Sequence, residues 1–89
     1  MIYVHFYGNA GYEGSEYSVY RAYADNMTEP ELGLESYDFA YDNARDLVFI
    51  ETKGKWPWKT KVEREAYFEK AIENRFWEYC SEEEYNNNK

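Results

Sequence analysis

The stretch IYVHFYGNAGYEGSEYSVYRAY, residues 2–23, decides the fold, because it consists of two alternating runs joined by a loop with three glycines. In the first run Ile2, Val4 and Phe6 fall on one face of an extended chain, and ring-bearing residues fall on the other. A period of two is typical of a strand with one buried face. Glycines in the connection permit positive φ angles. The sequence therefore predicts a β-hairpin.

A helix is predicted after the hairpin, over residues 28–45. Thr28 can cap it, Pro30 is tolerated in its first turn, and Glu31 completes a capping box. Apolar side chains then recur at spacings of three and four, which indicates one buried helix face. That face is formed by Tyr37, Ala40, Tyr41, Ala44 and then Leu47 or Val48.

A third strand and a second helix complete the predicted fold. The apolar, β-branched run LVFIET at 47–52 predicts the strand, and a capping box at Thr60 and Glu63 opens a long helix over 61–83. The buried stripe of that helix is expected at Phe68, Ile72, Phe76 and Tyr79. The predicted class is α+β: one compact domain, residues 1–85, in the order ββαβα. It has a three-stranded, mainly antiparallel sheet, two helices on one face, and a disordered polar tail at 86–89.

The charge is strongly and unevenly negative. The chain has 18 acids and 10 bases, a net charge of −8. Residues 1–52 carry net −8, residues 53–64 net +4 and residues 65–89 net −4. A field of this sign repels duplex nucleic acid and attracts basic proteins. The lone Cys80 excludes an internal disulfide, and no signal peptide or apolar span is evident, so we expect a cytoplasmic protein with no membrane partner.

Acidic ridges are predicted on both helices. The spacing of the acids places each set on one helix face, where like charges carry a small energetic cost. The first ridge consists of Glu31, Glu35, Asp38 and Asp42, and the second of Glu65, Glu69 and Glu73, with Trp77 one turn further. Two interpretations stay open: a solvated surface, or a docking surface for a basic partner.

A loop at 53–61 combines bases with indole rings. Its members are Lys53, Lys55, Trp56, Trp58, Lys59 and Lys61. Such a combination is used by single-stranded nucleic acid platforms, which hold phosphates on lysines and stack bases on rings. In the alternative interpretation the two tryptophans close the end of the core. The acidic segments on either side favour this alternative and make direct nucleic acid binding unfavourable.

No catalytic signature is present, and we expect no enzyme, cofactor or metal site. His5 would need an orienting carboxylate, which Glu16 or an acid on a helix would supply, and a nucleophile or substrate beside it. Cys80 has no Cys or His at ligand spacing, which indicates a small core residue. The glycine loop matches no phosphate-binding spacing, which favours a structural role.

The segments YGNAGYEGSEY (7–17), TEPE (28–31) and AYDNA (40–44) resemble a group of small acidic proteins. Phages and mobile elements of low-GC Gram-positive bacteria encode that group. This chain departs from the group in lacking cysteines near the glycine loop and in carrying the basic tryptophan loop. The resemblance implies a phage setting, in which small acidic proteins inhibit host nucleases, anti-CRISPR proteins among them.

The expected function is a non-enzymatic inhibitor that mimics DNA on a basic nucleic-acid-binding protein, such as a CRISPR nuclease. Whether the chain is a monomer or a homodimer stays open.

Overall fold

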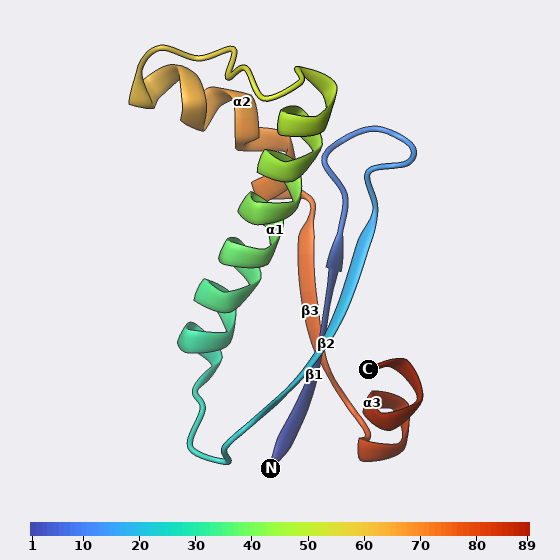
Figure 1. The fold of residues 1–89 in the computed structure, drawn as a ribbon. Coiled ribbons are helices and arrows are strands. Elements are labelled where there is room, and N and C mark those ends of the chain that lie inside the picture. The colour runs from blue at the N-terminus through green and yellow to red at the C-terminus, as the bar shows by residue number, and fades with distance from the viewer.

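The sheet has β1 at its centre, paired antiparallel with β2 on one side and β3 on the other. The computed structural model describes residues 1–89, and Figure 1 shows its six elements. They are β1 (Ile2–Gly8), β2 (Tyr17–Tyr23), α1 (Glu29–Glu51), α2 (Lys61–Glu73), β3 (Arg75–Cys80) and α3 (Glu82–Asn88). The predicted α+β class and three-stranded antiparallel sheet are confirmed. The chain order is β-β-α-α-β-α, so the predicted ββαβα order is wrong.

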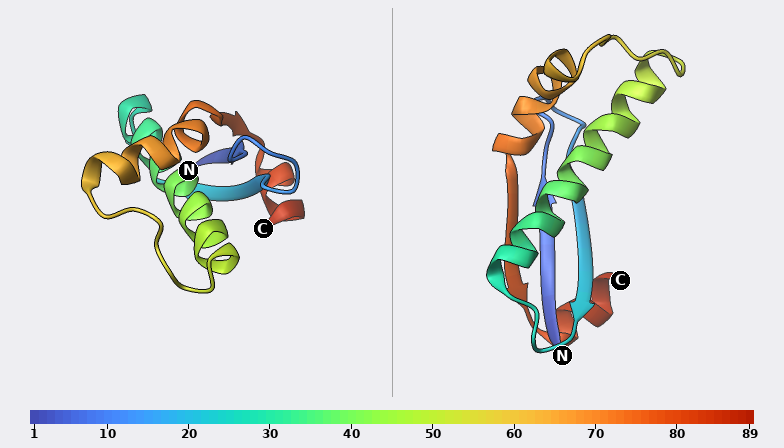
Figure 2. Two further views of the ribbon diagram at one scale, coloured as in Figure 1. Left: turned by 90° about the horizontal axis from the view of Figure 1, so that it is seen from above. Right: turned by 90° about the vertical axis from the view of Figure 1, so that its left-hand side faces the viewer.

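The predicted hairpin is present, and its alternation decides which face of the sheet is buried. Val4 and Phe6 are completely buried, and they form a cluster with Leu32 from the first turns of α1. Phe6 pairs with Val19 on β2 and with Trp77 on β3, which places all three side chains on this face. α1 lies across the same face (Figure 2).

Residues 47–51 are the last turns of α1 rather than a strand. Ala44 and Val48 are both buried, one helical turn apart, and they pack against Phe68 and Ala71 of α2. The helix ends at Thr52, whose backbone N–H and side-chain hydroxyl both donate to the Val48 carbonyl oxygen. The apolar run was misleading because only one of its side chains needs burial: Ile50, for example, is 75% exposed.

The long helix predicted over 61–83 breaks at Asn74, which caps α2 and is followed by β3. Of the predicted stripe, Phe68 is buried and Ile72 half-buried, whereas Phe76 and Tyr79 lie on β3 and are about half exposed. Pairing with β1 explains the break, because it satisfies the backbone of a segment rich in aromatic side chains, which favour strands. The tail predicted at 86–89 instead contributes residues 86–88 to α3.

The helices cover the sheet unequally. α1 has 23 residues, about 34 Å, whereas the seven residues of β1 span only about 23 Å, so α1 extends past the sheet. α2 packs on this projecting part, and α3 packs on the other face of the sheet, where Tyr85 contacts Tyr3 at a ring distance of 5.0 Å. The predicted arrangement, with two helices on one face of the sheet, is therefore not observed.

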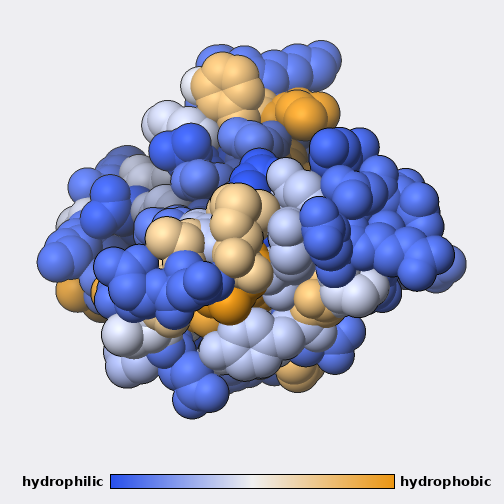
Figure 3. Space-filling model, turned by 90° about the horizontal axis from the view of Figure 1, so that it is seen from below, coloured by the Kyte–Doolittle hydropathy of each residue, from blue (hydrophilic) through white to orange (hydrophobic).

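The resulting molecule is elongated, measuring 41 × 25 × 18 Å. Viewed from below, its surface is mainly hydrophilic, with a small apolar patch near the centre (Figure 3). None of the three helices combines the length and the apolar character that a membrane-spanning helix needs.

Candidate acidic groove between α1 and α2

The second predicted ridge borders a groove of about 620 Å³ between α2 and α1. Glu65, Glu69 and Glu73 are all exposed, and their spacing of four residues aligns them along one side of α2. The apolar lining comes from Val62, Ala66 and Ile72 of α2 and from Tyr37 of α1. We call this feature the acidic groove.

The groove exists because the two helices meet closely at one place only. The small Ala44 and Ala71 side chains allow close contact beside Phe68. In Figures 1 and 2 the first turn of α2 stands away from α1, and α2 then crosses α1 near its own last turns. The space between the diverging helices is bordered by Tyr37 from one side and by the three glutamates from the other.

A second hollow of about 410 Å³ adjoins the acidic groove, because Tyr37 and Glu65 line both. Asp38 of the first predicted ridge lines this second hollow together with Lys61 and Arg64 of α2. The structure therefore brings one acid of α1 to the ridge of α2. It also places two bases in the lining of the same hollow, which the sequence pattern did not indicate.

The other acids of the first ridge point to other partners. Glu31 accepts a hydrogen bond from the Thr28 hydroxyl at 2.8 Å, rather than from the Thr28 backbone N–H as in a full capping box, and Asp42 lies 3.6 Å from Arg45. Burial raises the pKa of Tyr23 on β2, and the Glu35 carboxylate raises it further. Glu35 lines neither of the two hollows. Only part of this ridge therefore faces α2.

The acids of the groove are weakly neutralised. Glu65 pairs with Lys61 at 3.9 Å and Glu73 with Lys70 at 3.8 Å, and Glu69 takes part in none of the molecule's ion pairs. Exposed pairs of this kind contribute on the order of 0–1 kcal/mol, so water and cations compete for these carboxylates. Lys61 and Lys70 do not line the groove itself, and its lining holds three acids and no base.

Trp77 does not belong to the second ridge. It lies on β3, half-buried against the cluster of Val4, Phe6 and Leu32. The prediction was wrong because α2 ends at Glu73, so the side chain one turn further is no longer on the helix.

The two tryptophans of the basic loop contact each other and neighbouring rings, and Trp58 is the more buried of the two. Trp58 packs on Phe68 at a ring distance of 5.0 Å and stacks with Trp56 at 4.9 Å, and Trp56 in turn contacts Phe49. Trp58 therefore packs against the core as the second interpretation expects, whereas Trp56 is 42% exposed and does not. Three lysines of the loop are exposed and without an ion pair: Lys53, Lys55 and Lys59.

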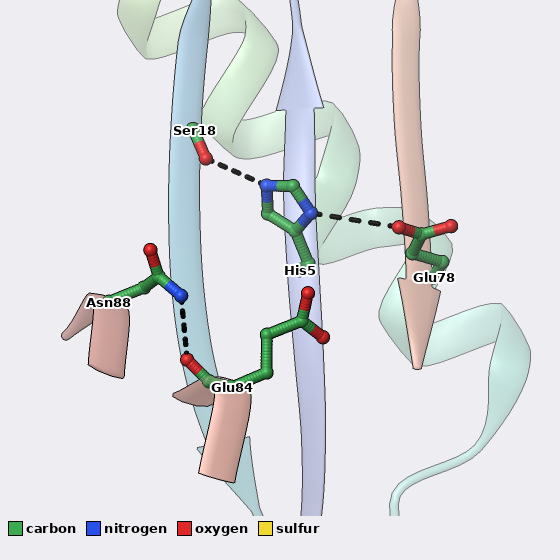
Figure 4. Close-up of polar contacts among 5 residues, drawn as sticks. All are labelled: His5, Ser18, Glu78, Glu84 and Asn88. Atoms are coloured by element: carbon green, nitrogen blue, oxygen red, sulfur yellow. Dashed lines mark hydrogen bonds and ion pairs between the residues drawn. The ribbon is translucent and has the colours of Figure 1, made fainter. Parts of the chain in front are cut away.

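His5 lies between the hydroxyl of Ser18 and the carboxylate of Glu78 (Figure 4). Its Nε2 lies 2.7 Å from Ser18 Oγ on β2, and its Nδ1 lies 3.8 Å from Glu78 Oε1 on β3. The Glu84 side chain of α3 also lies beside the ring in Figure 4. Neither Ser18 nor Glu78 could be identified without the strand register; the sequence suggested only Glu16 or an acid on a helix as the carboxylate.

This cluster has the residue types of nucleophilic catalysis, but none of the hollows of the molecule adjoins it. The imidazole is stacked on Tyr20 at 4.2 Å and on Tyr7 at 4.7 Å, and its side chain is only 17% exposed. None of the three hollows in the molecule includes His5 or its two polar neighbours. The contacts instead tie the three strands together.

Cys80 and metal chemistry offer no further candidate. Cys80 is half-buried on β3, and burial raises the pKa of its thiol, with Glu84 and Glu78 adding to the effect. A thiol kept protonated is a poor nucleophile. No group of three or more His, Cys, Asp or Glu side chains is arranged to hold a metal ion.

The comparisons with known proteins agree with one another. The chain matches no protein-family model, no curated protein and no solved structure.

Proposed function

We propose that this chain is a non-enzymatic acidic binding protein whose partner is a basic, nucleic-acid-binding protein. One observation carries the proposal: Asp38 of α1 and three glutamates of α2 line two adjoining hollows, although the two helices are separated in the chain. Net charge −8 adds a long-range attraction for a basic surface.

The acidic surface would occupy the site of a nucleic acid on that partner. Successive carboxylates at Glu65, Glu69 and Glu73 are about 6 Å apart along the helix axis, whereas one strand of DNA carries a charge every ~3.4 Å. A rigid helix presents fewer charges, but it holds them in place without ordering a flexible chain. The resemblance to acidic phage proteins gives the proposal its setting: an anti-CRISPR or similar inhibitor, acting in the host cytoplasm on a CRISPR nuclease or a related enzyme.

The test is capture of the partner from a bacterial lysate with the tagged protein. The captured protein is expected to be basic, to bind DNA or RNA, and to be released by nucleic acid or by salt, because exposed charges are screened over about 10 Å at 0.1 M. A variant with Asp38, Glu65 and Glu69 changed to Lys should capture nothing.

A matched control carries the same change of net charge elsewhere, with Glu13, Asp46 and Glu83 changed to Lys; these exposed acids line neither hollow. It should retain most of the binding. A partner that is acidic, or that holds nucleic acid and this protein at the same time, would contradict the proposal.

A further inference from the structure

The acidic groove has more apolar surface than an electrostatic mimic needs. Val62 is 76% exposed and Tyr37 40% exposed, and both border the groove together with Ala66 and Ile72. Mimicry of phosphate groups requires negative charges only, so it does not account for these apolar side chains. An apolar strip rimmed by charged residues is typical of a surface that receives an apolar side chain from another protein.

The charges of the groove restrict what can enter it. Glu65, Glu69 and Glu73 extend over about 12 Å, or two helical turns, with no base in the lining. Glu69 has no ion-pair partner, and the other two pair only weakly with lysines outside the lining. The occupant must therefore be cationic, which excludes nucleic acids, acidic peptides and anionic lipid surfaces.

The occupant must also satisfy its own backbone hydrogen bonds. Both walls of the groove are helices, whose backbone groups are bonded within each helix, so no strand edge is available for an extended peptide. A helix meets this condition because all its backbone bonds are internal. The groove, of about 620 Å³, is wide open to solvent and lined mainly by one face of α2, so an occupant lies along it rather than inside it.

We propose that the acidic groove receives an amphipathic basic helix of the partner, in an arrangement that rests on the proposed function. An apolar side chain of that helix packs on Val62, Ala66 and Tyr37, and lysines or arginines on either side pair with Glu65, Glu69 and Glu73. A second copy of this chain fits less well, since it carries net −8 and its basic segment holds Trp58 in its own core.

The test uses two synthetic 14-residue peptides as probes. Both carry the same lysines at helical spacing, and one has leucine where the other has serine on the opposite face. Burying a leucine should make the leucine peptide bind about tenfold or more tightly than the serine peptide, as measured by calorimetry at 0.15 M salt.

The deciding variant is Val62→Glu, which adds a negative charge while removing an apolar contact. It should weaken binding of the leucine peptide several-fold, although charge alone would strengthen it. The matched control is Ile50→Glu, the same kind of change at a side chain 75% exposed and outside the groove. It should leave binding unchanged or slightly tighter. Both variants keep the fold, because each side chain is mostly in solvent.

Three results would overturn this inference. If Val62→Glu tightens binding as much as Ile50→Glu does, the attraction is purely electrostatic; the groove is then not an anchor, while the proposed function stands. If sedimentation shows a dimer that Val62→Glu dissociates, the occupant is a second copy. If neither peptide binds at any salt concentration, and lysate capture also fails, the groove inference and the proposed function fail together.

Discussion

The two ends of α1 take part in two different cores. The lower core lies between α1 and the sheet, where Val4, Phe6 and Leu32 are fully buried. The upper core lies between the projecting part of α1 and α2, where two of the four buried residues are alanines and the largest is Phe68. The lower core is supported by β1, which is paired with a strand on each side. The upper core has two helices and the 53–60 loop, with Trp58 packed over it.

This difference indicates that stability is uneven along the molecule. Alanines bury little apolar surface, and several large side chains of the upper half stay exposed, among them Phe49 and Tyr67. Since the hydrophobic contribution is proportional to the apolar area removed from water, α2 should open at lower free energy than the sheet. The acidic groove lies in this weaker half, so a bound partner would stabilise the region that opens first.

The largest expected effect comes from removing the ring at the centre of either core. Phe6→Ala and Phe68→Ala should each cost about 3–5 kcal/mol, because both rings are almost fully buried. The total stability of an 89-residue domain is on the order of 4–13 kcal/mol, so Phe6→Ala should unfold much of the population. Phe68→Ala should instead release α2 while the sheet stays folded. Amide hydrogen exchange distinguishes the two outcomes.

The control for this prediction is Phe49→Ala, since that ring is 49% exposed and should matter far less. Equal loss of protection in α2 and in the β1–β2 pair after Phe68→Ala would show that both halves form one cooperative unit.

The lower half was also the more predictable one. In β1 fully buried residues alternate with half-buried ones, and the partner strand follows within the same stretch, so the local pattern and the tertiary packing agree. The helix start at Thr28 has its predicted cap, with the Thr28 hydroxyl accepting from the Glu31 backbone N–H.

The upper half could not be derived in the same way, because its elements are decided by contacts distant in sequence. The run at 47–51 has strand propensity but continues a helix that Ala44 and Val48 bury against α2. The lower half has one exception of the same kind: residues 75–80 continue a helical pattern, yet they pair with β1. One local signal was available: Ser81 and Glu84 form a helix start, with the Ser81 hydroxyl accepting from the Glu84 backbone N–H at 3.0 Å.

The candidate site was predictable only in part, for the same reason. Helical spacing correctly grouped Glu65, Glu69 and Glu73, because they lie within one unbroken helix. The placement of Asp38, Lys61 and Arg64 around one hollow depends on how α1 and α2 cross, which no local pattern contains.

A smaller effect is expected where the two halves join, at Gly8. A Cβ atom added there would lie against the Asn74 carbonyl oxygen, well inside van der Waals contact, and close to the Tyr17 ring. The Asn74 oxygen is a backbone atom that also accepts from the Asn9 N–H, so it cannot yield without moving the end of α2 from β1. Gly8→Ala should therefore cost about 1–3 kcal/mol in urea unfolding, and α2 amides should lose protection first.

Gly33→Ala provides a control of opposite sign. Gly33 lies in α1, and nothing is within 4 Å of a Cβ added there. Alanine is the better helix former, so this variant should gain roughly 0.5–1 kcal/mol. Stability of Gly8→Ala equal to that of the unmodified protein would mean that the two halves are not held together at this contact.

The smallest effect is expected at Tyr17, which begins β2 beside the same junction. Its hydroxyl is buried and has no hydrogen-bond partner, so Tyr17→Phe should be neutral or gain up to about 1 kcal/mol at pH 7.

Burial raises the pKa of Tyr17, and the nearby Arg75 only partly opposes this. The folded state therefore holds the phenol proton more tightly than the unfolded chain, in which tyrosine ionises near pH 10, at about its reference pKa. Stability is fully present below that pH and falls as the pH rises toward the higher folded pKa. Because Tyr17→Phe lacks this phenol, its advantage over the unmodified protein should grow between about pH 9 and pH 11, as urea midpoints at successive pH values would show. Burial also raises the pKa values of Tyr3, Tyr20 and Tyr23, so both proteins should weaken in alkali, and only the difference between them reports on Tyr17. Parallel pH curves would mean that the junction lets water reach the Tyr17 hydroxyl, and the upper half would then be held to the sheet more loosely than its contacts indicate.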